Sequence, residues 1–361
     1  MMKLKPGKKR VFLACMVMAA LLAVVGILRM NAENAARNRA EVTAQRLIAE
    51  YTGKQEELHL TTVVLDGEKA EITVYGAGGA IIREPEETSA ARRYEIGSLT
   101  KTFVGALFAQ YVTDGRVGID DPVSGYVDFG GKYDPTVKQL LSHTSAYADY
   151  RTDGFLQMAK FRLNKNPYRG ISSARIPVFM RRFSTGEPAP YGYSFSNFGY
   201  AVLGKTAEAV EGKAFAELLE RFIREDLGLY ETSFSGTDGI EKAWEWESDD
   251  AFLPAAGLKS DAGDLIRYVR LYFDAASDEA LKLAVSPLAR AEGTSSAAFG
   301  WGVREDGVVG HGGETSRCST QILFDGGKKH AVIVLADRSS AGEATVSSIA
   351  EMLYEENFGK K

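Results

Sequence analysis

The sequence predicts an α/β (α+β) domain in which an antiparallel sheet is flanked by helices and carries an inserted, mostly helical region. Strand-like apolar segments occur near both ends of this domain, around residues 59–75 and 299–336, whereas helical periodicity dominates between them. The 361-residue chain shows no internal repeat. A single sheet assembled from both ends is therefore the economical architecture.

The N-terminal segment predicts a membrane anchor. Residues 1–10 contain Lys and Arg but no acidic residue, and residues 11–28 are an uninterrupted run of apolar or small residues. As a helix this run would span roughly 27 Å, close to the thickness of the hydrocarbon core. The basic flank should stay in the cytoplasm, so we expect a single-pass protein of the cell membrane whose remaining domain, residues 58–358, lies outside the cytoplasm after a helical stalk, residues 29–57. A cleaved signal peptide is the alternative interpretation, although no clean small-residue cleavage site follows Leu28.

Composition excludes several other classes. The net charge is -5 and the pI about 5.6, so no basic excess suggests a nucleic-acid partner. Only two cysteines occur, and Cys15 lies in the apolar run, so we expect neither an intrachain disulfide in the domain nor cysteine-based zinc or redox chemistry. The four histidines form no H-E-x-x-H pair, and no metal or cofactor is predicted.

The first elements of the domain can be placed by turn and capping signals. Residues 59–65 and 70–75 are predicted to form a hairpin around Asp66-Gly67. A polar loop is expected at residues 84–91. An amphipathic helix is expected from Ser98 to Asp114, with Gly115 ending it.

The rest of the domain is predicted to be helical first and then strand-rich. Within the insertion, about residues 115–290, helices are expected at residues 136–142, 154–161, 197–211, 213–226 and 261–275. Strands are expected at residues 299–304, 319–324 and 331–336, followed by a final helix at about residues 343–356.

Ser98-Leu99-Thr100-Lys101 is the sharpest chemical signal. A spacing of three residues places the hydroxyl and the amine on one face of a helix. A serine hydroxyl is a poor nucleophile until a base is held beside it, and a partly desolvated lysine can supply that base because desolvation disfavours its charged form. Alone the pattern is weak, since an N-cap serine followed by a solvated lysine gives the same four letters.

The surrounding segments resemble the β-lactamase-related serine hydrolases, which include class C β-lactamases and penicillin-binding proteins. The resemblance extends over residues 58–358 and rests on motifs in the order in which that family has them. These are residues 94–103 with 115–123, then Leu140-Leu141-Ser142-His143-Thr144-Ser145, Ser196-Asn197-Phe198-Gly199-Tyr200, residues 256–265, and Gly310-His311-Gly312-Gly313. A β-lactamase/transpeptidase-like fold is what the resemblance implies.

The resemblance also implies roles for individual residues. Ser98 would be acylated, Lys101 would take or relay its proton, and Asn197 would bind the substrate's amide. His311 stands in place of the lysine of the third motif and could hold the proton network or a substrate carboxylate. The oxyanion hole would be the N–H of Ser98 and one from the strand just after Gly313, with Gly312 and Gly313 allowing close approach of the substrate.

One position departs from the family pattern. The second motif is expected to read Tyr-x-Asn, but here Phe195 precedes Asn197, so the phenol is missing from a place that would line the substrate site. Three interpretations stay open. Tyr193 reaches the site through a shifted loop, or Lys101 acts as the base alone or with His311, or the protein is a weak or inactive hydrolase. His143 is interpreted as a structural residue and not as a catalytic one.

The expected function is acyl transfer to water through an acyl-Ser98 intermediate. The substrate would be a small molecule or peptide with an amide or ester outside the membrane, such as a D-amino-acid-containing wall peptide or a β-lactam. Two alternatives remain. One is a catalytically impaired protein that binds wall peptides or β-lactams, motivated by Phe195, and the other is a membrane-anchored carboxylesterase.

Overall fold

The computed structural model describes most of the chain after residue 42. The chain divides into a unit of residues 1–46 and a unit of residues 47–361, and the second unit holds the sheet and its helices. The predicted anchor at residues 11–28 and most of the predicted helix at 154–161 lie outside the described residues. Among the residues that are described, no helix is both long and apolar enough to cross a membrane. The described residues are 43–54, 57–147, 159–160, 163, 165–183, 192–234, 240, 243–291, 295–338 and 345–359.

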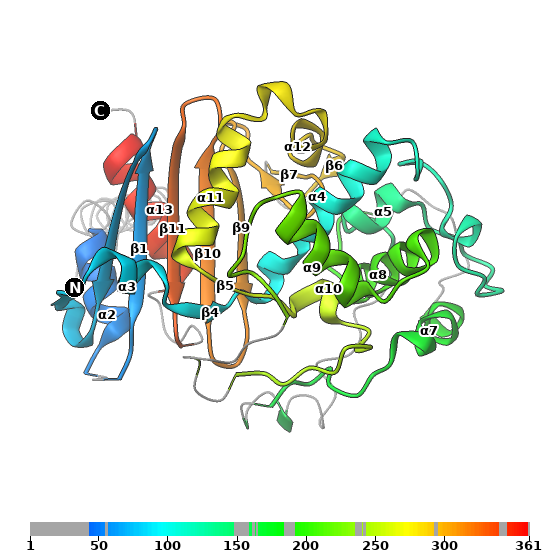
Figure 1. Cartoon of the computed structure of the whole chain (residues 1–361), viewed down its shortest axis with the longest axis horizontal. Coiled ribbons are helices and arrows are strands. Elements are labelled where there is room, and N and C mark those ends of the chain that lie inside the picture. Colours follow the sequence, from blue (N-terminus) through cyan, green and yellow to red (C-terminus); the bar gives the residue numbers. More distant parts are fainter. Residues whose placement is uncertain are drawn as a thin grey trace, which may run out of the picture. The chain divides into compact units, whose positions relative to one another are not determined.

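The main sheet has nine antiparallel strands in the order β3-β2-β1-β11-β10-β9-β8-β7-β6. Strand β1 lies between β2 and β11, so the first hairpin of the domain pairs with the last strand, as expected for a sheet assembled from both ends (Figure 1). A separate pair is formed by β4 (Arg93–Glu95) and β5 (Lys259–Asp261). The strands of the main sheet are β1 (Leu60–Asp66), β2 (Lys69–Tyr75), β3 (Ile81–Ile82), β6 (Ala289–Arg290), β7 (Ser296–Ala297), β8 (Gly302–Val303), β9 (Val309–Glu314), β10 (Ser319–Asp325) and β11 (His330–Ala336).

Both faces of the central strands are buried, because helices cover each of them. Successive side chains of a strand point to opposite faces. In β11, Ile333 and Leu335 belong to the large apolar cluster that also contains α11 (Ala262–Phe273). Val332 and Val334 belong to a second cluster with α2 (Ala44–Thr52) and α13 (Val346–Phe358). Residues 48 and 51, part of the predicted stalk, are therefore buried with the domain.

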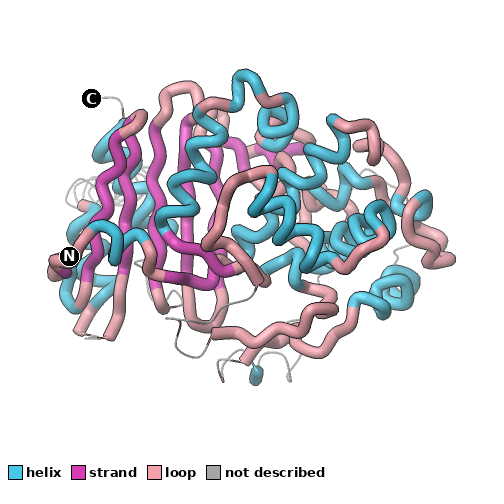
Figure 2. The backbone as a smooth tube through the Cα atoms, viewed as in Figure 1, coloured by secondary structure: helices cyan, strands magenta, loops and turns pink. Residues whose placement is uncertain are grey.

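The inserted region between β4 and β6 is mostly helical and extends to one side of the sheet (Figure 2). Its core is continuous with one face of the sheet, because the large apolar cluster runs from β1 and β11 through all the longer helices of the insertion. Besides α11, its helices are α4 (Thr100–Thr113), α5 (Val137–Leu141), α7 (Ile176–Phe183), α8 (Asn197–Glu211), α9 (Phe215–Glu225), α10 (Leu253–Ala256) and α12 (Glu279–Ala284).

The structure confirms the predicted hairpin, the helix after Ser98 and the two long strands β10 and β11. Some predictions differ. Of the strand expected at residues 299–304, only β8 (Gly302–Val303) forms. Residues 84–91 were expected to be a polar loop, but α3 (Glu86–Ala90) forms there, with Pro85 before it and acidic residues in its first turn. Strand β9 was not expected, because a segment reading Val-Gly-His-Gly-Gly-Glu lacks the residues that favour strands.

The contact between α4 and the segment before β8 leaves no room for a side chain at Gly105. A Cβ there would lie 1.8 Å from the Phe299 carbonyl oxygen. We expect Gly105→Ala to lower the free energy of unfolding by about 1–3 kcal/mol, because overpacking must displace backbone. Urea unfolding of the purified protein measures this. Gly125→Ala is the matched control, since a Cβ at Gly125 meets nothing within 4 Å, and equal losses in the two variants would contradict the packing argument.

Candidate active site

Ser98 lies where the chain enters α4. It is the middle residue of the short 3-10 turn η2 (Gly97–Leu99), which leads directly into the helix. Gly97 has φ +50°, a conformation that side chains disfavour, and this lets the chain turn sharply from β4 into the helix. The N–H of Ser98 belongs to the first turn, whose N–H groups have no acceptor within the helix.

The Lys101 ammonium is the centre of the site. Its side chain is completely buried, and its Nζ lies 3.0 Å from Ser98 Oγ, 2.8 Å from Asn197 Oδ1 and 2.8 Å from the Ala255 carbonyl oxygen. These three oxygens are neutral and come from η2, α8 and α10. Lys101 is therefore held next to the Ser98 hydroxyl by contacts to three separate elements.

Asn197 is the first residue of α8, and Ser196 caps this helix through a hydrogen bond from the Gly199 N–H. The Asn197 carboxamide bridges two residues. Its oxygen accepts from Lys101, and its Nδ2 donates to the Tyr168 hydroxyl at 3.2 Å. The Tyr168 ring is buried and stacks on Phe252 with 4.5 Å between centroids, which fixes the hydroxyl.

Strand β9 approaches η2 so closely that glycine is required at Gly313. A Cβ at Gly313 would lie 1.9 Å from the Ile96 carbonyl oxygen. The Thr315 N–H points toward β10 and donates to the Cys318 carbonyl oxygen at 2.9 Å. Successive N–H groups of a strand point to opposite edges, so the Glu314 N–H points to the other edge of β9, where η2 lies. A Cβ on Gly97 would meet this nitrogen at 2.6 Å. The Glu314 N–H is thus the strand donor expected just after Gly313.

His311 is a neutral acceptor in this site. Its Nδ1 contacts the Gly312 carbonyl oxygen, which can only accept, so the ring proton is on Nδ1 and Nε2 carries the lone pair. Desolvation and the nearby Lys101 lower the pKa of His311 to about 4. The imidazole is consequently uncharged at neutral pH, in contrast to the lysine that it replaces in the family motif.

Phe195 occupies the place of the missing phenol. Its ring is 41% exposed, and Lys101 Nζ lies 4.9 Å from the ring centroid, so an aromatic face and not a hydroxyl covers the lysine. Tyr193 packs edge-on against His143, with 5.8 Å between the ring centroids, and does not line the cavity beside Ser98. A catalytic role for Tyr193 stays a prediction.

His143 has the structural position that was predicted. It is buried, its Nδ1 accepts the Ser196 N–H at 3.1 Å, and its carbonyl oxygen accepts the Ser194 N–H at 2.8 Å. The ring packs on Phe195 with 4.7 Å between centroids. Burial lowers the pKa of His143 well below its ordinary value. His143 therefore fixes the segment that carries Phe195 and leads into Asn197.

Glu95 connects the nucleophile's turn to the far end of β9. Its buried carboxylate accepts from the Trp244 N–H at 2.6 Å and from the Thr315 hydroxyl at 2.9 Å. The Thr315 oxygen in turn accepts the N–H of Cys318 at 3.0 Å. Burial raises the pKa of Glu95. Through this network Glu95 fixes the β9–β10 turn immediately after the Glu314 N–H.

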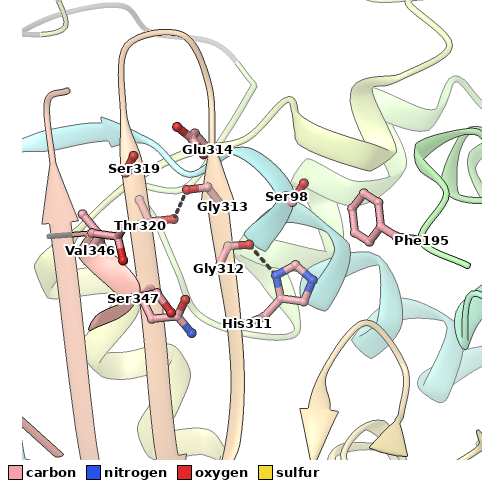
Figure 3. Close-up of a pocket in the computed structure, with 12 residues that line it drawn as sticks. Ser98, Phe195, His311, Gly312, Gly313, Glu314, Ser319, Thr320, Val346 and Ser347 are labelled. Carbon is pink, nitrogen blue, oxygen red and sulfur yellow. Dashed lines mark hydrogen bonds between the residues drawn. The ribbon is translucent and has the colours of Figure 1, made fainter. Parts of the chain in front are cut away.

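A cavity of 430 Å³ opens over Ser98 (Figure 3). Ser98, Phe195, His311, Gly312 and Gly313 all line it, as the sequence predicted for residues of one site. Lys101 and Asn197 lie beneath, in contact with Ser98 or with each other. The remaining lining residues, which the sequence did not indicate, are Glu314, Ser319, Thr320, Gln321, Thr345, Val346 and Ser347.

Three contributors to the site were missed from the sequence. The Ala255 carbonyl oxygen is a backbone group, for which no residue type is a signal. Tyr168 is separated from the second motif in the chain and reaches Asn197 only through the fold. Glu95 could have been suspected, because an acidic residue between Tyr94 and Ile96, just before Ser98, needs partners if these neighbours are buried.

Neutral His311 makes stability depend on pH in a defined window. In the unfolded chain a histidine takes up a proton near pH 6.5, whereas folded His311 resists protonation until about pH 4. The contribution of neutral His311 to the free energy of unfolding should therefore be complete above pH 6.5 and should decrease as the pH is lowered toward 4. Asp261, whose pKa burial raises to about 6, acts in the opposite direction. We expect the urea midpoint of His311→Asn to fall less between pH 7 and pH 4.5 than that of the wild type. An equal fall in the two proteins would contradict the conclusion that folded His311 is uncharged.

Comparison with known proteins agrees with this geometry. The profile of the Beta-lactamase family matches residues 44–353. The chain is 23% identical to protein flp of Staphylococcus aureus over 292 residues, 73% of this chain and 57% of flp. It is 24% identical to AmpH of Escherichia coli, a D-alanyl-D-alanine-carboxypeptidase/endopeptidase, over 231 residues, 59% of this chain and 57% of AmpH. The chain thus covers little more than half the length of these curated relatives.

Solved structures share the fold at low sequence identity. The octameric penicillin-binding protein homologue from Pyrococcus abyssi superposes with a TM-score of 0.69 at 19% identity, covering 88% of this chain and 76% of that one. A class C β-lactamase from Rhodobacter sphaeroides gives 0.65 at 19% identity, covering 86% and 97%. With a family profile that matches most of its residues and a β-lactamase/transpeptidase-like fold, the chain belongs to the Beta-lactamase family of serine hydrolases.

Proposed function

We propose that this protein hydrolyses an amide or ester outside the cytoplasm through an acyl-Ser98 intermediate. The observation that carries the proposal is the 3.0 Å contact between Lys101 Nζ and Ser98 Oγ beneath an open cavity. A nucleophile held within hydrogen-bonding distance of a base is the arrangement that covalent acyl transfer requires. The substrate class we favour is a D-amino-acid-containing wall peptide, with β-lactams as molecules that acylate the same serine.

The chain's own residues supply each step of this reaction. Ser98 Oγ attacks the substrate carbonyl while its proton passes to the neutral amine form of Lys101, and the ammonium formed in this step then protonates the leaving group. The N–H groups of Ser98 and Glu314 stabilise the oxyanion, since both belong to backbone segments that meet at the cavity. Water enters the leaving group's place and attacks the acyl carbonyl, while Lys101 accepts a proton from the water and passes it to Ser98 Oγ as that oxygen leaves.

Because Phe195 has no hydroxyl group, the proposed mechanism gives the proton transfers to Lys101. The phenyl ring excludes water from one side of the lysine but has no proton to exchange. His311 Nε2 is an uncharged acceptor on the cavity wall and can hold the attacking water or a substrate N–H. Lys101 is accordingly the base, with His311 as its assisting partner.

The relatives and the N-terminal sequence support the location and the substrate class. AmpH is described as a D-alanyl-D-alanine-carboxypeptidase/endopeptidase, which fits a wall peptide as substrate. The basic segment and apolar run at residues 1–28 favour a single-pass anchor with the hydrolase domain on the outer side. Both statements are proposals for this chain.

Covalent labelling of the full chain in detergent tests the proposal. We expect a penicillin and a reactive phosphonate ester each to add one acyl or phosphonyl group to Ser98, seen by intact-protein mass spectrometry and peptide mapping. Ser98→Ala should take up neither reagent, whereas Ser124→Ala, a change at an exposed serine that does not line the cavity, should react like the wild type. Folded wild-type protein that forms no adduct with either reagent would refute the hydrolase.

A catalytically impaired protein that binds wall peptides or β-lactams is the second candidate, and the absence of a hydroxyl on Phe195 favours it. Its signature is an acyl-Ser98 adduct that forms but is not hydrolysed. The lifetime of the penicillin adduct therefore separates it from the proposed enzyme.

Placing a tyrosine at position 195 tests whether the missing hydroxyl limits hydrolysis of the acyl-enzyme. We expect Phe195→Tyr to speed decay of the penicillin adduct by about tenfold or more, because one added proton-transfer group contributes about 10²–10⁴ in favourable cases. Time-resolved mass spectrometry of the adduct gives the rate. Phe195→Leu keeps the side chain apolar and should not speed the decay, so similar rates for the two variants would show that position 195 is not the vacant proton-transfer place.

A further inference from the structure

One wall of the catalytic cavity takes no part in the proposed proton transfers. Ser98 lies between Phe195, which belongs to the insertion, and the opposite wall, which β9, β10 and the start of α13 form (Figure 3). Asn197, the residue assigned to the substrate's amide, follows Phe195 on the insertion side. With the acyl arm held on that side and the scissile carbonyl at Ser98, the leaving group extends toward the opposite wall.

Gln321 of β10 fills part of this opposite wall. In the sheet register it pairs directly with Gly312 of β9, and it lines the cavity. A Cβ at Gly312 would lie 2.6 Å from Gln321 Oε1, and a Cβ at Gly310 would lie 3.7 Å from Gln321 Nε2. The carboxamide therefore lies along β9, and glycine at position 312 leaves the space that it occupies.

The orientation of the Gln321 carboxamide is fixed by its neighbour in the strand. Its Nε2 lies 3.2 Å from the Ile322 carbonyl oxygen, which can only accept, so the nitrogen faces Ile322 and Oε1 faces Gly312. Nε2 keeps a second N–H, and no described residue donates to Oε1. Gln321 thus offers a bound molecule both an acceptor and a donor, which is the combination that an amide matches.

The lining of the cavity supplies no positive charge for a carboxylate. Among the described residues that line it there is no lysine or arginine, and uncharged His311 and acidic Glu314 are among them. Lys101 lies beneath, with its hydrogen bonds already taken by three oxygens. At the start of α13, the capping box already uses the N–H groups of Thr345 and Ser348. A carboxylate would enter this cavity without a counter-ion, which costs free energy.

We propose that Gln321 determines specificity for the leaving group and selects one that ends in an amide over one that ends in a free carboxylate. The inference rests on the proposed function and narrows its substrate class to internal or amidated positions of a peptide. A peptide amide can both donate to Oε1 and accept from Nε2, whereas a carboxylate only accepts and is repelled by Oε1. Penicillin, which has a carboxylate beside its leaving nitrogen, is accordingly a slow acylating agent of Ser98.

Two thioesters with the same acyl group test this selection. The S-carboxymethyl and S-carbamoylmethyl thioesters of phenylacetylglycine differ only in a carboxylate against a carboxamide, and hydrolysis of either gives phenylacetylglycine and the free thiol. Each kcat/KM is divided by the rate constant for hydroxide hydrolysis of the same ester. We then expect the wild type to prefer the carboxamide ester by about tenfold. Gln321→Lys should shift this preference about fivefold toward the carboxylate, because it places an ammonium on the same wall.

Two further variants make the test specific. Gln110→Lys is the matched control, since it makes the same substitution on α4, where Gln110 donates to Asp114 and does not line the cavity, and it should leave the preference unchanged. Gln321→Glu keeps the shape of the side chain and should increase the preference for the carboxamide, which gives a second test if the lysine variant does not fold. Equal corrected rates for the two esters in the wild type, or a preference that no change at Gln321 alters, overturn the inference.

A binding measurement keeps this inference apart from the hydrolase itself. In Ser98→Ala, calorimetric titration should show tighter binding of phenylacetylglycylglycinamide than of phenylacetylglycylglycine, and Gln321→Lys made in this background should reduce the difference. If neither thioester is hydrolysed but this pattern holds, the selection by Gln321 stands and the proposed function falls. Equal binding of the two peptides, or a difference that survives Gln321→Lys, overturns the selection even where the thioesters are hydrolysed.

Discussion

The burial of one ammonium group determines how the site is assembled. Lys101 is completely buried, and an ammonium removed from water must find acceptors inside the protein. It finds them on three elements, in the Ser98 hydroxyl, the Asn197 carboxamide and the Ala255 carbonyl oxygen. The helices α8 and α10 must therefore meet the start of α4 at fixed positions. The same contacts that satisfy the lysine also place it beside the nucleophile.

A second constraint is the contact between η2 and β9, which brings the sheet to the nucleophile. Glycine at Gly97 and Gly313 lets two backbones approach within a distance that any side chain would prevent. Glu95 stabilises the same junction from below, because its carboxylate bonds both the 243–244 segment and Thr315. Oxyanion donors are effective only when they are positioned before the reaction begins. Here the positioning depends on groups that never touch the substrate.

Much of this site follows from sequence, because its side chains lie in short local patterns. The spacing of Ser98 and Lys101 on one helical turn, the capped start of α8 at Asn197 and the glycines beside His311 each have local physical reasons. The strand that carries His311 was not recognised, because its glycines disfavour strand structure and β10 and η2 impose it. Tyr168 and the Ala255 carbonyl oxygen could not be found, since their roles arise only when distant segments meet.

The pairing of β1 with β11 has a consequence for how the protein is made. On the ribosome, the first hairpin emerges long before its partner strand, and Thr345, Val346 and Ser347, which line the catalytic cavity, emerge later still. Until then β1 has an unpaired edge, and such edges associate with other chains. The cavity over Ser98 is therefore incomplete until these last residues have been made. Chaperone capture and protease sensitivity should be concentrated in this interval, before the last strand and helix close the sheet.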